Sequence, residues 1–377
     1  HALWHDGEPV TRGQKHVLRT DVMYRRVQGR CGATAVDEGV PQQARSDALD
    51  GGVPAPVAWI DAHSGYVFAA ARLADGRLVT GGRDRAIRIW ADALDGRGLQ
   101  LRGTLGGHSA SIVALLPEPS LNAGDSPWLL SASRDHTVWM HDLHAGTSRL
   151  WLRLPAAALS LAAIGSRRVA VGTADGRIHV CTADASGAAQ LQAVIAAHRG
   201  WVWALAAQPD GTWASGGEDG DICIWHGDAR GDVPSVRHAG GHGPVHALTW
   251  LTDGRLAAGC ADGTLLLLRR VADGSGLVVD AAWPAHRGEL YCVTQLGNRT
   301  LATGGEDGTV RVFALETGEC VGCVQHGGFV RTVVALDGAR MVSGSYDGRI
   351  GVCTWDGADA RLAAATAAQA GARVERK

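Results

Sequence analysis

The sequence predicts an all-β fold built from seven copies of one unit, and three observations carry that prediction. Between His63 and Cys353 a pattern recurs in which a His opens an apolar stretch, an Asp follows 20 to 27 residues later, and a bulky residue stands six positions after the Asp. Successive Asp residues are 51, 40, 44, 43, 45 and 40 positions apart, a period typical of stacked structural repeats. Between Asp-Gly and Gly-Gly turns the apolar stretches alternate at strand length, which predicts short antiparallel strands.

The copies differ in how much of the pattern they keep. The clearest are the first and the fourth, which contain His63, Thr80, Asp84 and Trp90, and His198, Ser215, Asp219 and Trp225. The weaker copies are anchored at Asp135, Asp175, Asp262, Asp307 and Asp347. In each unit the Asp falls in a tight turn, where its carboxylate can accept backbone hydrogen bonds. A His, a hydroxyl and an indole N–H can then complete a buried network.

The period, the openings Gly107-His108 and Gly241-His242, and the Trp six residues after the Asp resemble the WD-repeat family. The resemblance covers about residues 53–355 and implies a seven-bladed β-propeller in which each unit is a four-stranded blade. It also implies that the four groups form a structural tetrad, complete in the first and fourth blades.

The other copies lack parts of the tetrad. The hydroxyl position holds Val171 and Ala258 in the third and fifth copies, and the third copy lacks its His. The Trp position of copies two, three, five, six and seven holds His141, Cys181, Leu268, Phe313 and Cys353. We expect these blades to depend more on apolar packing.

Closing such a ring requires one more strand for the last blade. The extended segment from Val53 to Ile60 is predicted to supply it by pairing with the strand around Ile350 to Cys353. The alternative is the Ala-rich segment 356–377, but it has few β-branched residues and its composition favours a frayed tail or helix.

Residues 1–24 do not fit the repeat. The pattern His5-x-Gly-x-Pro-Val-x-x-Gly-x-Lys15-x-Val-Leu-Arg19 resembles the C-terminal end of iron(II)/2-oxoglutarate dioxygenases of the prolyl 4-hydroxylase type. The resemblance implies a short remnant of a double-stranded β-helix domain. In it, His5 would be an iron(II) ligand and Lys15 the partner of the far carboxylate of 2-oxoglutarate, with Arg19 as a second candidate.

The His-x-Asp pair that supplies the remaining iron ligands in that family belongs well upstream of His5, where the sequence as given has no residues. We therefore expect no cofactor and no catalysis in the chain as given, with iron(II) and 2-oxoglutarate belonging to a longer parent protein. The alternative is an unrelated leader. Residues 25–52 are rich in Gly, Gln and mixed charges without periodicity and are predicted to be a linker.

Composition agrees with a large soluble β protein. The chain is 46% hydrophobic and 20% charged with a formal net charge of −2, so neither a nucleic acid nor a membrane is an expected partner. His, Asp and Ser recur together in copy after copy, which indicates a framework rather than a catalytic triad. We expect a monomeric propeller. The eight Cys show no disulfide pattern, so we also expect an intracellular setting, cytoplasmic or nuclear.

One pair of thiols has a motif-like spacing, Cys320-Val-Gly-Cys323. On a regular strand, residues three apart point to opposite faces. The sequence therefore argues against a zinc or redox site, and no second Cys or His pair accompanies this one.

The resemblance places partner contacts at three rim positions in each blade: three and five residues after the His, and one before the Asp. Five of the chain's seven Tyr and Phe fall on these positions. The candidate partner-binding residues are Tyr66, Phe68, Arg83, Arg134, Trp201, Trp203, Glu218, His246, Glu289, Tyr291, Glu306, Phe329, Arg331 and Tyr346. Aromatic and Arg side chains at a propeller mouth suit a protein or peptide ligand; the alternative is that the aromatic residues only pack between strands.

The charges at these positions are unevenly distributed. Arg331, Arg83 and Arg134 fall on three successive blades, whereas Glu218, Glu289 and Glu306 fall on the opposite side. The sequence thus predicts an electrically divided mouth for a segment with an acidic or phosphorylated end and an apolar middle.

Two classes of function follow. The first is a non-catalytic scaffold. The second is the C-terminal fragment of a dioxygenase whose propeller recruits the substrate. A His-x-Asp pair upstream of His5 would favour the second.

Overall fold

The computed structural model describes residues 55–93, 98–117, 128–184, 187–227, 234–271, 274, 276–337 and 340–354. All of them belong to the second of two compact units, Gly52–Lys377. The segments 1–24, 25–52 and 356–377, for which a dioxygenase remnant, a linker and a frayed tail are predicted, lie outside the described residues.

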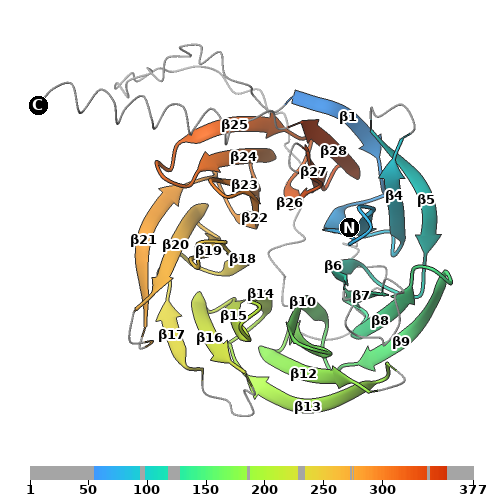
Figure 1. The fold of residues 1–377 in the computed structure, drawn as a ribbon, viewed down its shortest axis with the longest axis horizontal. Helices are drawn as coiled ribbons and strands as arrows, with labels where there is room; N and C mark the ends of the chain where they lie inside the picture. Colours follow the sequence, from blue (N-terminus) through green and yellow to red (C-terminus); the bar gives the residue numbers. More distant parts are fainter. Residues whose placement is uncertain are drawn as a thin grey trace, which may run out of the picture. The chain divides into compact units, whose positions relative to one another are not determined.

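The described residues form seven four-stranded antiparallel sheets arranged as the blades of a ring (Figure 1). This confirms the predicted all-β, seven-bladed propeller. Blade 1 contains β2 (Val67–Arg72), β3 (Leu78–Gly82), β4 (Ile87–Asp92) and β5 (Leu99–Leu105); blade 2 contains β6 (Ile112–Pro117), β7 (Trp128–Ser133), β8 (Thr137–Asp142) and β9 (Thr147–Arg153). Blade 3 contains β10 (Ala158–Gly165), β11 (Arg168–Thr173), β12 (Arg177–Ala183) and β13 (Ala189–Ala196); blade 4 contains β14 (Val202–Ala207), β15 (Thr212–Gly217), β16 (Asp221–His226) and β17 (Val236–Ala239).

Blade 5 contains β18 (Val245–Trp250), β19 (Leu256–Cys260), β20 (Thr264–Arg270) and β21 (Leu277–Pro284). Blade 6 contains β22 (Leu290–Gly297), β23 (Thr300–Gly305), β24 (Thr309–Ala314) and β25 (Cys320–Gln325). Blade 7 contains β26 (Val330–Ala335), β27 (Arg340–Ser345), β28 (Arg349–Thr354) and, as its outermost strand, β1 (Ala55–Asp61). Strands β6, β10, β14, β18, β22 and β26 lie nearest the centre of the ring in their sheets (Figure 1).

The ring is closed by its first strand, as the sequence predicts. β1 pairs antiparallel with β28, with Ile60 opposite Ile350 and Ala55 opposite Thr354. Trp59 of β1 lies edge-on to the ring of His326 in blade 7, with centroids 4.6 Å apart. This pairing joins the first and the last strand of the propeller in sequence order, and so holds the two ends of the ring together.

The core lies between neighbouring blades, where apolar side chains of one sheet pack on the next. One cluster joins Ile222 and Ile224 of blade 4 to Leu256, Leu266 and Leu268 of blade 5. These side chains are fully buried, so each blade gains most of its apolar stabilisation from its neighbours.

The Gly-Gly pairs before the Asp residues have a steric cause, shown by blade 4. A Cβ on Gly216 would lie 2.6 Å from Cγ1 of Val245 in blade 5, and a Cβ on Gly217 would lie 2.3 Å from Nδ1 of His198. Neither position has room for a side chain. The glycines thus let the next blade and the tetrad His approach the backbone closely.

One expectation about strand geometry is wrong. β25 has a β-bulge between the residues opposite Val312 and Phe313: Gly322 pairs with Val312, Cys320 pairs with Phe313, and Val321 is the extra residue. Cys323 pairs with Arg311. Because the bulge removes one step of the alternation, Cys320 and Cys323 lie on the same face of the strand rather than on opposite faces.

Candidate partner-binding mouth

Blades 1 and 4 contain complete four-residue networks. In blade 4, His198 contacts Asp219 through Nδ1 at 2.9 Å and Ser215 through Nε2 at 2.8 Å. The indole N–H of Trp225 donates to the Ser215 hydroxyl at 3.0 Å. In blade 1 the corresponding contacts of His63, Thr80, Asp84 and Trp90 are 2.7, 2.8 and 2.9 Å.

Blade 2 keeps a full network with a different fourth member. His108 contacts Asp135 at 2.9 Å and Ser131 at 2.7 Å. His141, at the Trp position, contacts the same Ser131 hydroxyl through Nε2 at 2.7 Å. Its Nδ1 lies 2.8 Å from the hydroxyl of Ser148. The expectation that blade 2 lacks part of the tetrad is therefore wrong, because both ring nitrogens of His141 can hydrogen-bond and one of them takes the place of the indole N–H.

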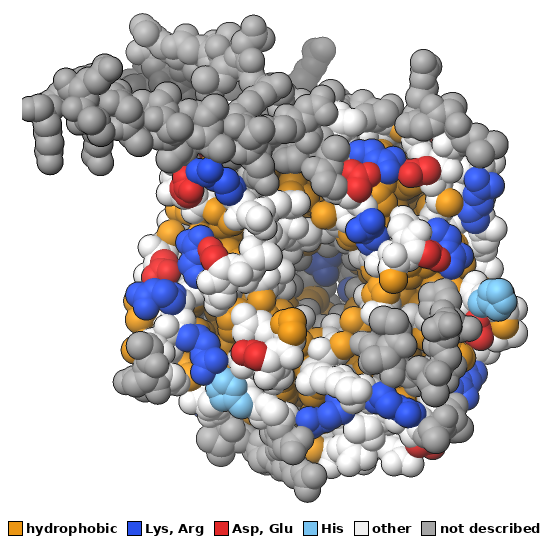
Figure 2. Space-filling model, viewed as in Figure 1, with side chains coloured by type: hydrophobic (Ala, Val, Ile, Leu, Met, Phe, Trp, Pro, Cys, Tyr) orange, Lys and Arg blue, Asp and Glu red, His pale blue; other side chains and the backbone are white. Residues whose placement is uncertain are grey.

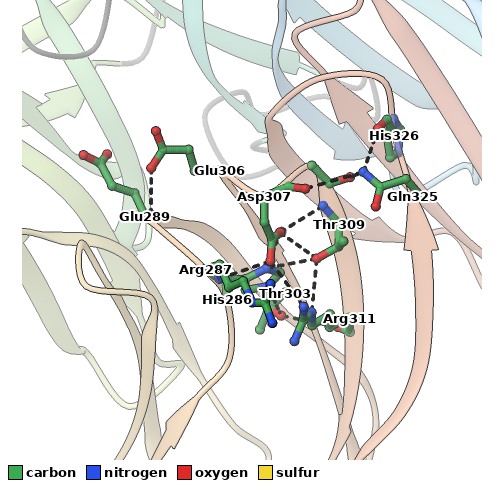
Figure 3. Close-up of polar contacts among 12 residues, drawn as sticks. His286, Arg287, Glu289, Thr303, Glu306, Asp307, Thr309, Arg311, Gln325 and His326 are labelled. Carbon is green, nitrogen blue, oxygen red and sulfur yellow. Dashed lines mark hydrogen bonds and ion pairs between the residues drawn. The ribbon is translucent and has the colours of Figure 1, made fainter. Parts of the chain in front are cut away.

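Blade 6 retains three of the four groups. His286 contacts Asp307 at 2.9 Å and Thr303 at 2.7 Å, and Thr309 donates to Asp307 at 2.6 Å (Figure 3). The buried ring of Phe313 occupies the Trp position. Blade 7 is looser: His326 contacts Ser343 at 2.7 Å, but its Nδ1 is 4.0 Å from Asp347.

Blades 3 and 5 have lost the buried network. In blade 3 the Asp175 carboxylate accepts from Thr173 at 2.6 Å and pairs with Arg177. In blade 5 His242 contacts Asp262 at 2.7 Å, but the two side chains are 34% and 46% exposed. The contacts of Asp175 with Arg177 and of Asp262 with His242 are exposed and contribute little to folding.

The rim positions form a continuous wall of aromatic rings over five blades. The chain of ring contacts runs from Trp201 to Trp203 (4.6 Å), His246 (4.9 Å), Tyr291 (5.6 Å), Phe329 (6.2 Å), Tyr346 (5.3 Å) and Tyr66 (4.1 Å, stacked). Phe68 contacts both Tyr66 and Tyr346. We call these eight rings the aromatic wall. Blades 2 and 3 place Ser111, Val113, Ser160 and Ala174 at the equivalent positions.

The wall combines packing with exposed surface. Phe68 and Tyr291, five residues after the His of their repeats, and His246, four residues after His242, are at most 9% exposed, which agrees with the packing interpretation. Tyr66, Trp201, Phe329 and Tyr346 are half-buried. The buried rings therefore fix the wall to the underlying strands, and the half-buried rings leave part of its surface exposed to solvent.

The two Arg residues on blades 1 and 2 lie on this wall. Cζ of Arg83 is 4.9 Å from the Tyr66 ring centroid, and Cζ of Arg134 is 5.5 Å from that of Phe68. Such stacking holds each guanidinium in place against an aromatic ring.

Arg331 does not join these two. Its Cζ lies 4.4 Å from the Tyr291 ring and 6.0 Å from the Trp203 ring. The side chain thus points toward the half of the mouth that holds the Glu residues. The predicted division of charge is reduced accordingly, because a cation is attracted to the electron-rich ring faces and to the nearby carboxylates.

The three Glu residues of the mouth each contact a neighbouring group of the rim. Oε2 of Glu306 accepts the backbone N–H of Glu289 at 3.1 Å (Figure 3), and Glu218 accepts from the indole N–H of Trp203. Glu289 lies 3.2 Å from Nε2 of His246. Contact with His246 lowers the pKa of Glu289 despite the opposing effect of burial.

Several polar atoms at this place are buried without a hydrogen-bond partner among the described residues. They are both ring nitrogens of His246, Oε2 of Glu289 and Nε of Arg331. The 3.2 Å contact between His246 and Glu289 has an ion-pair distance but not the geometry of a hydrogen bond. Buried polar atoms are normally satisfied, so this group needs water or a ligand.

The centre of the ring is hollow, and Figure 2 shows basic side chains within the hollow and apolar side chains around it. In the part of the chain that the structure describes, no group of three or more His, Cys, Asp or Glu side chains is placed to hold a metal ion. His5 and Lys15 lie outside the described residues; their assignment to iron and 2-oxoglutarate stays a prediction. None of the described segments forms a helix that is long and apolar enough to cross a membrane.

Comparison with known proteins agrees with this architecture. The WD domain, G-beta repeat, matches residues 55–91, 99–142, 189–226, 234–267 and 279–313. The chain is also similar to the ribosome biogenesis protein YTM1 of Podospora anserina, with 38% identity over 140 residues, which are 36% of this chain and 27% of that protein. The matched region thus spans about a quarter of that relative. The chain is a seven-bladed β-propeller that contains five WD40 repeats.

Proposed function

We propose that the propeller is a monomeric, non-catalytic scaffold that binds a protein or peptide segment across its mouth. The observation that carries the proposal is the aromatic wall, which is partly exposed and lies beside buried polar atoms that make no hydrogen bond to the described residues. Rigid aromatic rings and Arg side chains contribute most of the energy in protein interfaces. A wall already held by its own packing loses little entropy when a partner binds.

The chemistry of the wall points to a segment with two polar ends. Arg83 and Arg134 suit an acidic or phosphorylated group, because planar guanidinium groups bind carboxylates and phosphates through paired hydrogen bonds. The rings of Tyr66, Tyr346 and Phe329 suit an apolar middle. At the other end, a hydrogen-bonding group of the segment would satisfy His246.

The repeat architecture supports the same class of function, since WD40 propellers generally bind proteins. The likeness to a ribosome biogenesis protein extends over a few blades only. It supports a nuclear setting, one of the two intracellular settings that the sequence favours, and names no partner.

A peptide selection tests the proposal. A displayed library of acidic and phosphorylated peptides is selected on the full chain, and the recovered peptides are titrated against wild type and variants. Arg83→Glu should weaken binding at least about tenfold, because it replaces a charge-assisted contact by repulsion. The matched control is Arg77→Glu, an Arg in the turn at the opposite end of β2 and β3 in the same blade.

The control should leave affinity unchanged. Equal effects of Arg83→Glu and Arg77→Glu would place the binding surface elsewhere on the propeller. Failure to recover any peptide whose affinity is reduced by Tyr66→Ala would count against a peptide ligand at the mouth.

A further inference from the structure

The outer edge of blade 6 carries two exposed cysteines that the mouth does not use. Cys320 and Cys323 are exposed, whereas Cys181, Cys223, Cys260 and Cys353 are buried. Burial raises the pKa of Cys181, Cys223 and Cys260 to about 12. Within the described residues, the thiols open to a dissolved reagent are therefore concentrated in one pair.

The β-bulge brings these two thiols together. Cys320 is opposite Phe313 and Cys323 is opposite Arg311, so the two cysteines stand only two ladder positions apart and share one face. Two positions correspond to about 6.8 Å along a strand, which is the upper end of the Cα separations that a disulfide spans.

The thiol of Cys320 lies close to the peptide group that joins Gly322 to Cys323. Its Sγ lies 3.3 Å from the carbonyl oxygen of Gly322, the group bonded to the backbone nitrogen of Cys323. Neither thiol is needed for the core, because β25 is the outermost strand of its sheet. The pair thus combines proximity with exposure.

We propose that Cys320 and Cys323 are a thiol–disulfide couple, which exchanges with a small-molecule disulfide such as glutathione disulfide and closes an intramolecular disulfide. In the first step the thiolate of Cys320 attacks one sulfur of the small disulfide, whose other sulfur leaves as a thiolate. Cys323 then loses its proton to solvent and attacks Sγ of Cys320, which releases the second thiol. Two protein thiols and one small disulfide give one protein disulfide and two small thiols.

The roles follow from the surroundings of each sulfur. Burial raises the pKa of Cys323, so Cys320 is the thiol that reacts first with the dissolved disulfide. A bond that spans the long end of the allowed range on an exposed strand should be easily reduced, as regulatory disulfides are.

The test uses the full chain with Cys31, which lies outside the described residues, replaced by Ser. The protein is equilibrated with mixtures of reduced and oxidised glutathione, quenched, alkylated and digested with trypsin. Cleavage after Arg311 and Arg331 puts both cysteines in one peptide. With an excess of glutathione disulfide, this peptide should lose the mass of two hydrogen atoms and take up no alkylating reagent, while the buried cysteines are alkylated after unfolding and serve as the internal control.

Two variants separate the steps. Cys323→Ser should accumulate a glutathione adduct on Cys320 that persists at least about ten times longer than in the parent protein, since the resolving thiol is missing. Cys320→Ser should form its adduct more slowly. Both substitutions fall on an exposed edge strand and leave the core intact.

Three outcomes would overturn the proposal: both thiols stay reduced at every glutathione ratio, glutathione adducts persist on both cysteines of the parent protein, or the peptide joins to another chain. Phenylarsine oxide gives a second readout without an oxidant, because it is retained by two thiols within reach of one arsenic atom. It should bind one equivalent per chain and be lost in Cys320→Ser; equal retention by that variant would contradict the pairing.

Discussion

Blades 4 and 5 are neighbours with the same four-stranded topology, yet they are held in different ways. Blade 4 contains a buried network of His198, Ser215, Asp219 and Trp225. Blade 5 has Ala258 and Leu268 at the hydroxyl and Trp positions, both fully buried, and leaves Asp262 at the surface. The difference teaches that a blade can replace the whole network by packing, because exchanging both partners of a buried hydrogen bond for apolar groups is close to neutral.

Blade 5 contains one exception to this replacement. His246 is 9% exposed, and neither of its ring nitrogens has a hydrogen-bond partner in the described part of the chain. A buried polar group without a partner is destabilising. In a blade whose other buried positions are apolar, such a residue is more simply explained by ligand binding than by folding.

The largest expected effect is the loss of the blade 4 carboxylate. Asp219→Ala removes the acceptor for Nδ1 of His198 and for the backbone N–H of Arg199. We expect the free energy of unfolding to fall by about 2–3 kcal/mol, because the buried imidazole of His198 and a backbone N–H both lose a charged acceptor. Chemical denaturation of wild type and variant measures the change.

Protonation of buried imidazoles should produce an intermediate effect. Burial lowers the pKa of His141 to about 3 and that of His326 to about 4, below the ordinary value near 6.5. The unfolded chain binds these protons first, so stability is complete above about pH 6.5 and is lost as the pH falls toward 4.

Replacing His141 by Gln keeps a hydrogen-bonding side chain that does not titrate. Between pH 6.5 and 5 the variant should lose about 1–2 kcal/mol less than wild type. His242→Gln is the matched control, since His242 is half-exposed in blade 5. Identical pH profiles for wild type and His141→Gln would show that His141 does not remain neutral in the folded blade.

The smallest effect is expected for the carboxylate of blade 5. Asp262→Ala breaks an exposed contact with His242, so the free energy of unfolding should change by less than about 1 kcal/mol. Equal destabilisation by Asp262→Ala and Asp219→Ala would contradict the claim that blade 4 depends on its network and blade 5 on apolar packing.

The sequence predicted the number of blades and the closing strand because spacing and turn residues are local signals. It also identified the residues of the aromatic wall, since rim positions recur at fixed distances from the His and the Asp. The direction of Arg331 could not be predicted, because it depends on Tyr291 and Trp203, which belong to other blades. Cys320 and Cys323 share a face because of a β-bulge. The extra residue that makes the bulge has no clear signal in the sequence, so this arrangement could not be predicted.

His246→Leu tests most directly whether the mouth is built for a partner rather than for folding. The variant replaces a buried imidazole by an apolar side chain of similar size and removes its contact with the partly exposed Glu289, so the account predicts an unfolding free energy within about 1 kcal/mol of that of wild type. It also predicts at least about tenfold weaker binding of the peptides selected on the wild-type chain. A loss of more than about 2 kcal/mol in stability with unchanged peptide affinity would contradict it and make His246 a structural residue of blade 5.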